Sequence, residues 1–79
     1  MRASVVISKR GAGYISSVVG KFGGGYSGCR AGLTPYDAAA HAAQLMQRYA
    51  VGNQEGGDLM APPEVLELVP ESLRNVAAR

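Results

Sequence analysis

The residues best suited to binding chemistry are the glycines and basic side chains between positions 20 and 36. This stretch reads GKFGGGYSGCRAGLTPY, and Lys21 and Arg30 lie on either side of its central glycine cluster. Glycine has no side chain to bury and loses the most backbone entropy on folding, so such a run adds little to a core. Its backbone N–H groups and the two cations suit contact with phosphate instead. The stretch therefore predicts recognition of phosphate or of an RNA backbone.

Two nucleotide-binding motifs do not fit this stretch. A Walker loop needs Gly-Lys followed by Ser or Thr, whereas Phe22 follows the Gly-Lys pair here. Gly23, Gly25 and Gly28 have the spacing of a dinucleotide fingerprint, but the expected helix begins too late after them. A plain connector between a strand and a helix stays open as the alternative to phosphate binding.

Groups able to support catalysis or metal binding are sparse. The chain has one histidine, His41, and one cysteine, Cys29, too few for a structural zinc site or an internal disulfide. The sequence offers no recognisable acid and base pair and no nucleophile beside a base. We expect His41 on the polar side of a helix, Cys29 as a small packing residue, no catalytic residues, no metal, no cofactor and no enzymatic activity.

Length and charge limit the fold and its partners. Seventy-nine residues make at most one small domain, and one Phe, four Tyr and no Trp leave little bulk for a core. Residues 1–51 carry six basic side chains against one acidic, a net charge of +5, while residues 52–79 carry two against five, a net −3. The first part suits a polyanion and the second suits protein. No apolar run approaches the ~20 residues of a membrane span, so we expect a soluble chain with no membrane partner, in a reducing compartment.

Local patterns predict a hairpin and a helix. The β-branched segments 4–9 and 14–19 flank a glycine-bearing turn. Thr34 followed by Pro35 is typical of a helix start, and the helix should run over residues 35–50. The residues expected on its apolar side are Tyr36, Ala39, Ala42, Ala43, Leu45, Met46, Tyr49 and Ala50; those expected on its polar side are Asp37, His41, Gln44 and Arg48.

Composition divides the chain into three parts. Residues 1–51 form the hairpin-plus-helix unit, residues 52–63 a Gly/Pro linker, and residues 64–79 a short helical tail. The apolar residues of the tail are too few for a separate domain. The tail therefore either folds back on the hairpin or docks on a partner chain, and the linker favours docking.

These features together resemble the first half of the small-subunit ribosomal protein eleven family, over about residues 4–50. The matching residues are Gly28, Arg30, Thr34, Pro35 and Tyr36, with Gly23 and Gly25 in the family's glycine cluster and Ala39, Ala42 and Ala43 in its helix. Ser27 and Ala31 stand where that family usually has basic residues, and no counterpart of its second half is recognised after Val51. These departures predict that this chain binds phosphate more weakly than members of that family.

The resemblance implies a fold. It is α/β, a partial ribonuclease-H-like unit made of an antiparallel β-hairpin, a glycine-rich loop and one alanine-rich helix, followed by an extended tail with short helical turns.

The resemblance also implies a function, that of a structural protein on the platform of the small ribosomal subunit, in a mitochondrial matrix ribosome or alternatively in the cytoplasm. Its partners would be ribosomal RNA of the small subunit and neighbouring ribosomal proteins, including a chain that could supply the missing second half. The RNA-binding residues expected are Lys9, Arg10, Lys21, Gly23, Gly24, Gly25, Ser27, Gly28, Arg30 and Thr34. The alternative function is a non-catalytic protein–protein adaptor or accessory subunit of another large complex.

Overall fold

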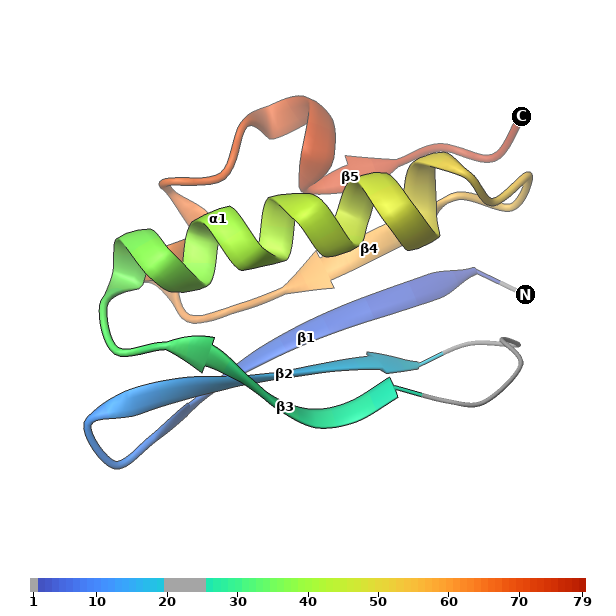
Figure 1. The fold of residues 1–79 in the computed structure, drawn as a ribbon. Coiled ribbons are helices and arrows are strands. Elements are labelled where there is room, and N and C mark those ends of the chain that lie inside the picture. Colours follow the sequence, from blue (N-terminus) through green and yellow to red (C-terminus); the bar gives the residue numbers. More distant parts are fainter. Residues whose placement is uncertain (1, 20–25) are drawn as a thin grey trace.

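Strands β1 (Ala3–Arg10) and β2 (Gly13–Val19) form the predicted antiparallel hairpin, in register from Ser4 opposite Val19 to Arg10 opposite Gly13. The computed structural model describes residues 2–19 and 26–79. Gly11 in the connecting turn has a φ of +57°, a left-handed conformation that glycine adopts without steric cost. The hairpin prediction is confirmed (Figure 1).

The next strand corrects the prediction of a continuous glycine-rich loop. β3 (Tyr26–Gly32) pairs antiparallel with β2, with register shifts along the pair. Gly28 and Gly32 have φ of +68° and +115°, so glycine here permits an irregular strand rather than a loop. The unpaired N–H and C=O groups on the open edge of β2 favour this pairing over weak local strand propensity.

Helix α1 (Pro35–Leu45) begins where the sequence predicts. The Asp37 backbone N–H donates to Thr34 Oγ1 at 3.1 Å, so Thr34 is the N-cap. The helix continues as η1 (Met46–Val51), which has π-type pairing and ends close to the predicted residue 50. Tyr36 differs from prediction, since it is 73% exposed. At about 100° per residue, it lies roughly opposite the buried Ala38 on the helix.

The C-terminal part adds β4 (Gly57–Met60), α2 (Pro63–Leu66), η2 (Glu71–Leu73) and β5 (Asn75–Val76). β4 pairs parallel with β1, and β5 pairs antiparallel with β4. A parallel pair needs a long crossover connection, and the segment that contains α1 supplies it. The result is a mixed α/β domain with one five-stranded sheet in the order β3-β2-β1-β4-β5.

The structure differs from the predicted linker at residues 52–63 and from a tail that docks only on a partner. Val65 and Val69 are 0% and 1% exposed and belong to the chain's own core. A Cβ on Gly57 would lie 2.6 Å from the Ala50 Cβ. Glycine here therefore allows a strand and a helix to approach closely, instead of releasing the tail.

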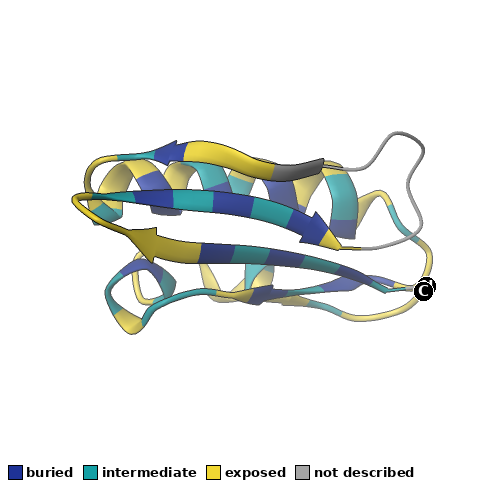
Figure 2. Ribbon diagram, turned by 90° about the horizontal axis from the view of Figure 1, so that it is seen from below, coloured by how far each residue is buried: buried dark blue, intermediate teal, exposed yellow. Residues whose placement is uncertain are grey.

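The sheet has two different faces. Side chains alternate along each strand, and α1 covers the face that carries Val5, Ile7 and Val18. The opposite face, called the open face below, is seen in front of the helix in Figure 2. Its side chains come from Arg2, Ser4, Val6, Ser8 and Arg10 of the first strand region, Ile15, Ser17 and Val19 of β2, Arg30 of β3, and Asp58 and Met60 of β4. Within the described residues, no helix is long and apolar enough to cross a membrane.

Candidate nucleic-acid interface

The sheet separates the basic residues that the sequence singles out. Lys9 and Arg10 are consecutive on β1, so strand alternation directs Lys9 toward the helix side and Arg10 toward the open face. Arg30 is directly opposite Ile15 of β2, and paired residues share a face. The structure therefore brings Arg10 and Arg30 to one face and leaves Lys9 on the other.

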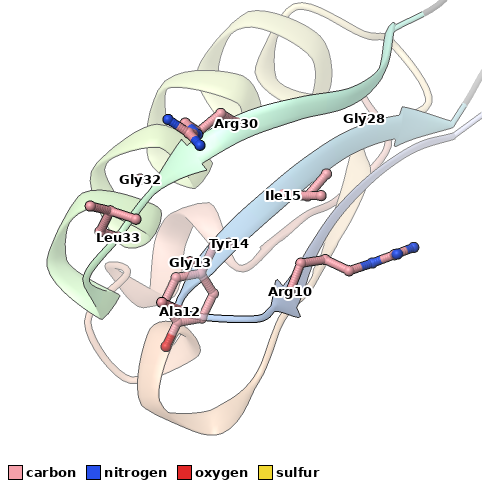
Figure 3. A pocket seen from close by; sticks show the side chains of 9 residues that line it. All are labelled: Arg10, Ala12, Gly13, Tyr14, Ile15, Gly28, Arg30, Gly32 and Leu33. Carbon is pink, nitrogen blue, oxygen red and sulfur yellow. The ribbon is translucent and has the colours of Figure 1, made fainter.

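Arg10 and Arg30 border a recess at the hairpin end of the open face, called the arginine recess below. It has a volume of about 360 Å³, and Figure 3 shows Ile15 between the two arginines. Gly13 leaves the space open, because a Cβ there would lie 3.0 Å from the Gly32 carbonyl oxygen and 3.2 Å from Leu33 Cδ2. The lining of the recess thus combines two cations with backbone and aliphatic side chains; Tyr14 also lines it, although its side chain is only 5% exposed.

The described residues that line the recess include two cations, Arg10 and Arg30, and no acid; the Asp37 carboxylate lies next to the lining residue Gly32, 3.3 Å from where a Cβ there would stand. Among the described residues, neither the Arg10 nor the Arg30 guanidinium has a hydrogen bond or an ion pair, and both side chains are exposed. The one acid on the open face of the described sheet, Asp58, lies 2.8 Å from an Arg2 nitrogen and is engaged there. Arginine stays charged at every physiological pH. The two cations of the recess are therefore available to an anion.

The register also sets how far apart the two arginines start. Arg10 is opposite Gly13 and Arg30 is opposite Ile15, so the two positions are two strands and two residues apart. A strand spacing of about 4.8 Å and a rise of about 3.3 Å per residue put their Cα atoms roughly 12 Å apart. Two long side chains at that separation can contact one anion or two neighbouring anions.

The other predicted RNA-binding residues have separate places. Gly28 lines the recess, and its N–H donates to Ser17 Oγ at 3.4 Å. Thr34 is occupied in capping α1, and Ser27 is part of the β3 backbone. Lys21, Gly23, Gly24 and Gly25 lie outside the described residues.

A serine–histidine contact joins the sheet to the helix, which sequence reasoning missed. Ser16 Oγ lies 2.9 Å from His41 Nε2 and 3.2 Å from the Cys29 carbonyl oxygen. His41 is half-buried rather than on the polar side. The position of His41 in the sequence could have predicted this burial. His41 follows Ala38 by three residues and precedes Leu45 by four, which places it beside the buried stripe of the helix.

This contact is better explained as structural than as catalytic. Ser16 is 0% exposed, so a substrate has no access to its hydroxyl oxygen, and the contact anchors α1 on β2. Cys29, expected to pack as a small residue, is exposed on the edge strand. No group of three or more potential metal ligands is found within the part of the chain that the structure describes.

A second polar contact ties the hairpin to the C-terminal part. The Tyr14 hydroxyl donates to Glu64 Oε1 at 3.5 Å. Burial, and after it the charge and hydrogen bond of Glu64, raise the pKa of Tyr14 above its usual value of 10.0. Tyr14 therefore stays protonated and keeps its donor role throughout the neutral range.

Comparison with models of known protein families and with curated proteins finds no match to this chain.

Proposed function

We propose that the protein binds RNA through the open face of its sheet, as a structural protein of the small ribosomal subunit. The observation that carries the proposal is the arginine recess, where two exposed guanidinium groups from different strands border one hollow. Arginine binds phosphate through several donors of fixed geometry. Phosphate contacts supply much of the affinity of nucleic-acid-binding proteins and fix their position on the nucleic acid.

The ribosomal part of the proposal draws on the sequence pattern around Arg30 and Thr34. The mixed sheet, with β1 antiparallel to β2 and parallel to β4, supports a partial ribonuclease-H-like unit as its fold. The ribosome would be mitochondrial, or alternatively cytoplasmic. Small-subunit RNA and neighbouring ribosomal proteins would be the partners.

A second candidate, a non-catalytic protein–protein adaptor, is favoured by a different observation. Val19 and Met60 on the open face are 53% and 59% exposed. Large exposed apolar side chains on a sheet face suit contact with another protein. In this reading the arginines would serve only the rim of a protein interface.

Salt dependence separates the two candidates. We would measure binding of the full chain to a labelled single-stranded RNA by fluorescence anisotropy between 50 and 300 mM KCl. Each phosphate contact on a single strand contributes about 0.7 to the slope of log affinity against log salt. Arg10→Gln and Arg30→Gln should each reduce the slope by about that amount. Arg48→Gln removes the same charge from an exposed residue of η1 and should leave the slope unchanged.

Two outcomes would count against RNA binding through this face. Affinity that is insensitive to salt would favour the adaptor, and equal slopes for all three variants would remove the recess from the interface. For the ribosomal part, the chain should sediment with small ribosomal subunits through a high-salt cushion. Its complete release at that salt would contradict stable incorporation.

A further inference from the structure

We propose that the arginine recess takes a single unstacked nucleotide, with its base against the apolar interior and its phosphate on Arg10 or Arg30. This inference rests on the proposed function and names its substrate class, single-stranded rather than duplex RNA. The two proposals fail in different ways, because RNA binding by phosphate contact alone needs no recess.

The hollow shape of the recess favours a single strand over a duplex. In a duplex the bases are paired and stacked inside and the phosphates lie outside, so a duplex offers a hollow nothing to insert. A single strand can turn one base outward. At about 360 Å³, the recess is near the lower end of ligand pockets, roughly 300 to 1,000 Å³, which suits one nucleotide rather than several.

The lining of the recess combines apolar and charged groups. The lining includes the backbone of Gly13, the half-buried Ile15 and Leu33, which is 63% exposed. Contact with aliphatic side chains does not stabilise a phosphate, whereas it does stabilise the flat face of a base. The charges belong to the lining residues Arg10 and Arg30, which lie on either side of Ile15 in Figure 3. An apolar centre with cations at its edge matches a base with its flanking phosphates.

The arginine side chains are the groups in the recess that can hold a base. Aromatic platforms are the usual partners of unstacked bases. The one aromatic among the described lining residues, Tyr14, is only 5% exposed, and its hydroxyl is engaged with Glu64, so its ring offers no open face to a base. Guanidinium groups can take that place, because their planar faces stack on bases. We therefore expect the site to discriminate weakly among bases and strongly between strands with and without bases.

The test compares four probes with the full wild-type chain at 150 mM salt. They are a 12-nucleotide single-stranded RNA, the duplex of the same sequence, an abasic strand with the same number of phosphates, and adenosine monophosphate as competitor. The single strand should bind about tenfold tighter than the abasic strand, within the range for one base contact, and tighter than the duplex. Competition by the mononucleotide at concentrations similar to the oligonucleotide would also support the recess, with a free nucleotide as its occupant.

Two variants locate the effect. Leu33→Ala removes one wall at an exposed position and should lower the ratio of single-strand to abasic affinity. Leu68→Ala is the control, because Leu68 is a partly exposed leucine, 39% exposed, and does not line the recess. Gly13→Ala adds a methyl group inside the recess. It should bring the ratio of single-strand to abasic affinity to about one, without weakening binding of the abasic strand. A variant that has lost its fold would weaken both, so the ratio separates the two causes.

Equal affinity for the base-bearing and abasic strands would overturn the nucleotide recess and leave RNA binding by phosphate contact intact. Tighter binding of the duplex, or an unchanged ratio in both recess variants, would also overturn it. No binding to any RNA probe at low salt would overturn the proposed function as well.

Discussion

Val65→Ala tests whether the C-terminal part is integral to the fold. Val65 is 0% exposed in the core, and the substitution deletes two buried carbon groups. At about 0.8 kcal/mol for each, with a further contribution from the cavity left behind, the free energy of unfolding should fall by about 2 to 3 kcal/mol. For a chain of this size the total is roughly 4 to 12 kcal/mol, and the melting temperature should drop by about 10 to 20 °C.

The assay is urea denaturation of the full chain, followed by circular dichroism, without RNA or partner protein. Leu68→Ala is the matched control, because it changes a neighbouring apolar residue that is 39% exposed; its cost should stay below about 1 kcal/mol. If the tail instead docked only on a partner, Val65 would face water in the isolated chain. A Val65→Ala change within about 0.5 kcal/mol of wild type would then be seen, and it would refute the packing described above.

Three further predictions concern the backbone, a helix cap and pH. Gly56→Ala should cost more than about 3 kcal/mol in urea denaturation, because Gly56 has a φ of +73° and its new Cβ would overlap the backbone of β5. Gly11→Ala should cost only about 1 to 2 kcal/mol, since its φ is also positive but no described atom beyond Gly11 and its two chain neighbours lies within 4 Å of the added Cβ. Thr34→Ala should lower stability by about 1 kcal/mol and speed amide exchange in the first turn of α1. Because the pKa of Tyr14 is raised in the folded state, Tyr14 loses its proton first in the unfolded state as pH rises. Stability should therefore hold below pH 10 and fall as pH rises toward the folded pKa. Glu64→Gln should lower the folded pKa of Tyr14, measured by phenolate absorbance.

The parts of the fold that neighbouring residues determine could be predicted from the sequence. Two short β-branched runs around a glycine-bearing turn predicted the hairpin, and Thr34 with Pro35 predicted the start of α1. Each signal depends on residues that are adjacent in the chain. Their structural outcome therefore needed no knowledge of distant contacts.

The parts that distant contacts determine could not be predicted in this way. β4 is only four residues long and contains Gly57 and Asp58, so its local propensity is weak; it becomes a strand because β1 supplies a partner. β3 contains Gly28 and Gly32, so its local propensity is also weak, and it becomes a strand because β2 supplies a partner. At the site, Arg10 and Arg30 were both identified, but their meeting at one recess depends on the pairing of three strands and on the missing side chain of Gly13.

The position of β1 has a consequence for synthesis. Of the five strands in this sheet β1 is made first, yet it lies in the middle, with β2 on one edge and β4 on the other. Its pairing with β2 can form early, whereas its second edge must wait until residues 57–60 have been translated. During that interval the nascent chain presents a row of unpaired backbone groups, a template for pairing with another chain. Chains truncated before residue 57 should therefore associate through β1, and a chaperone acting on this protein would be needed mainly until residues 57–60 have been made.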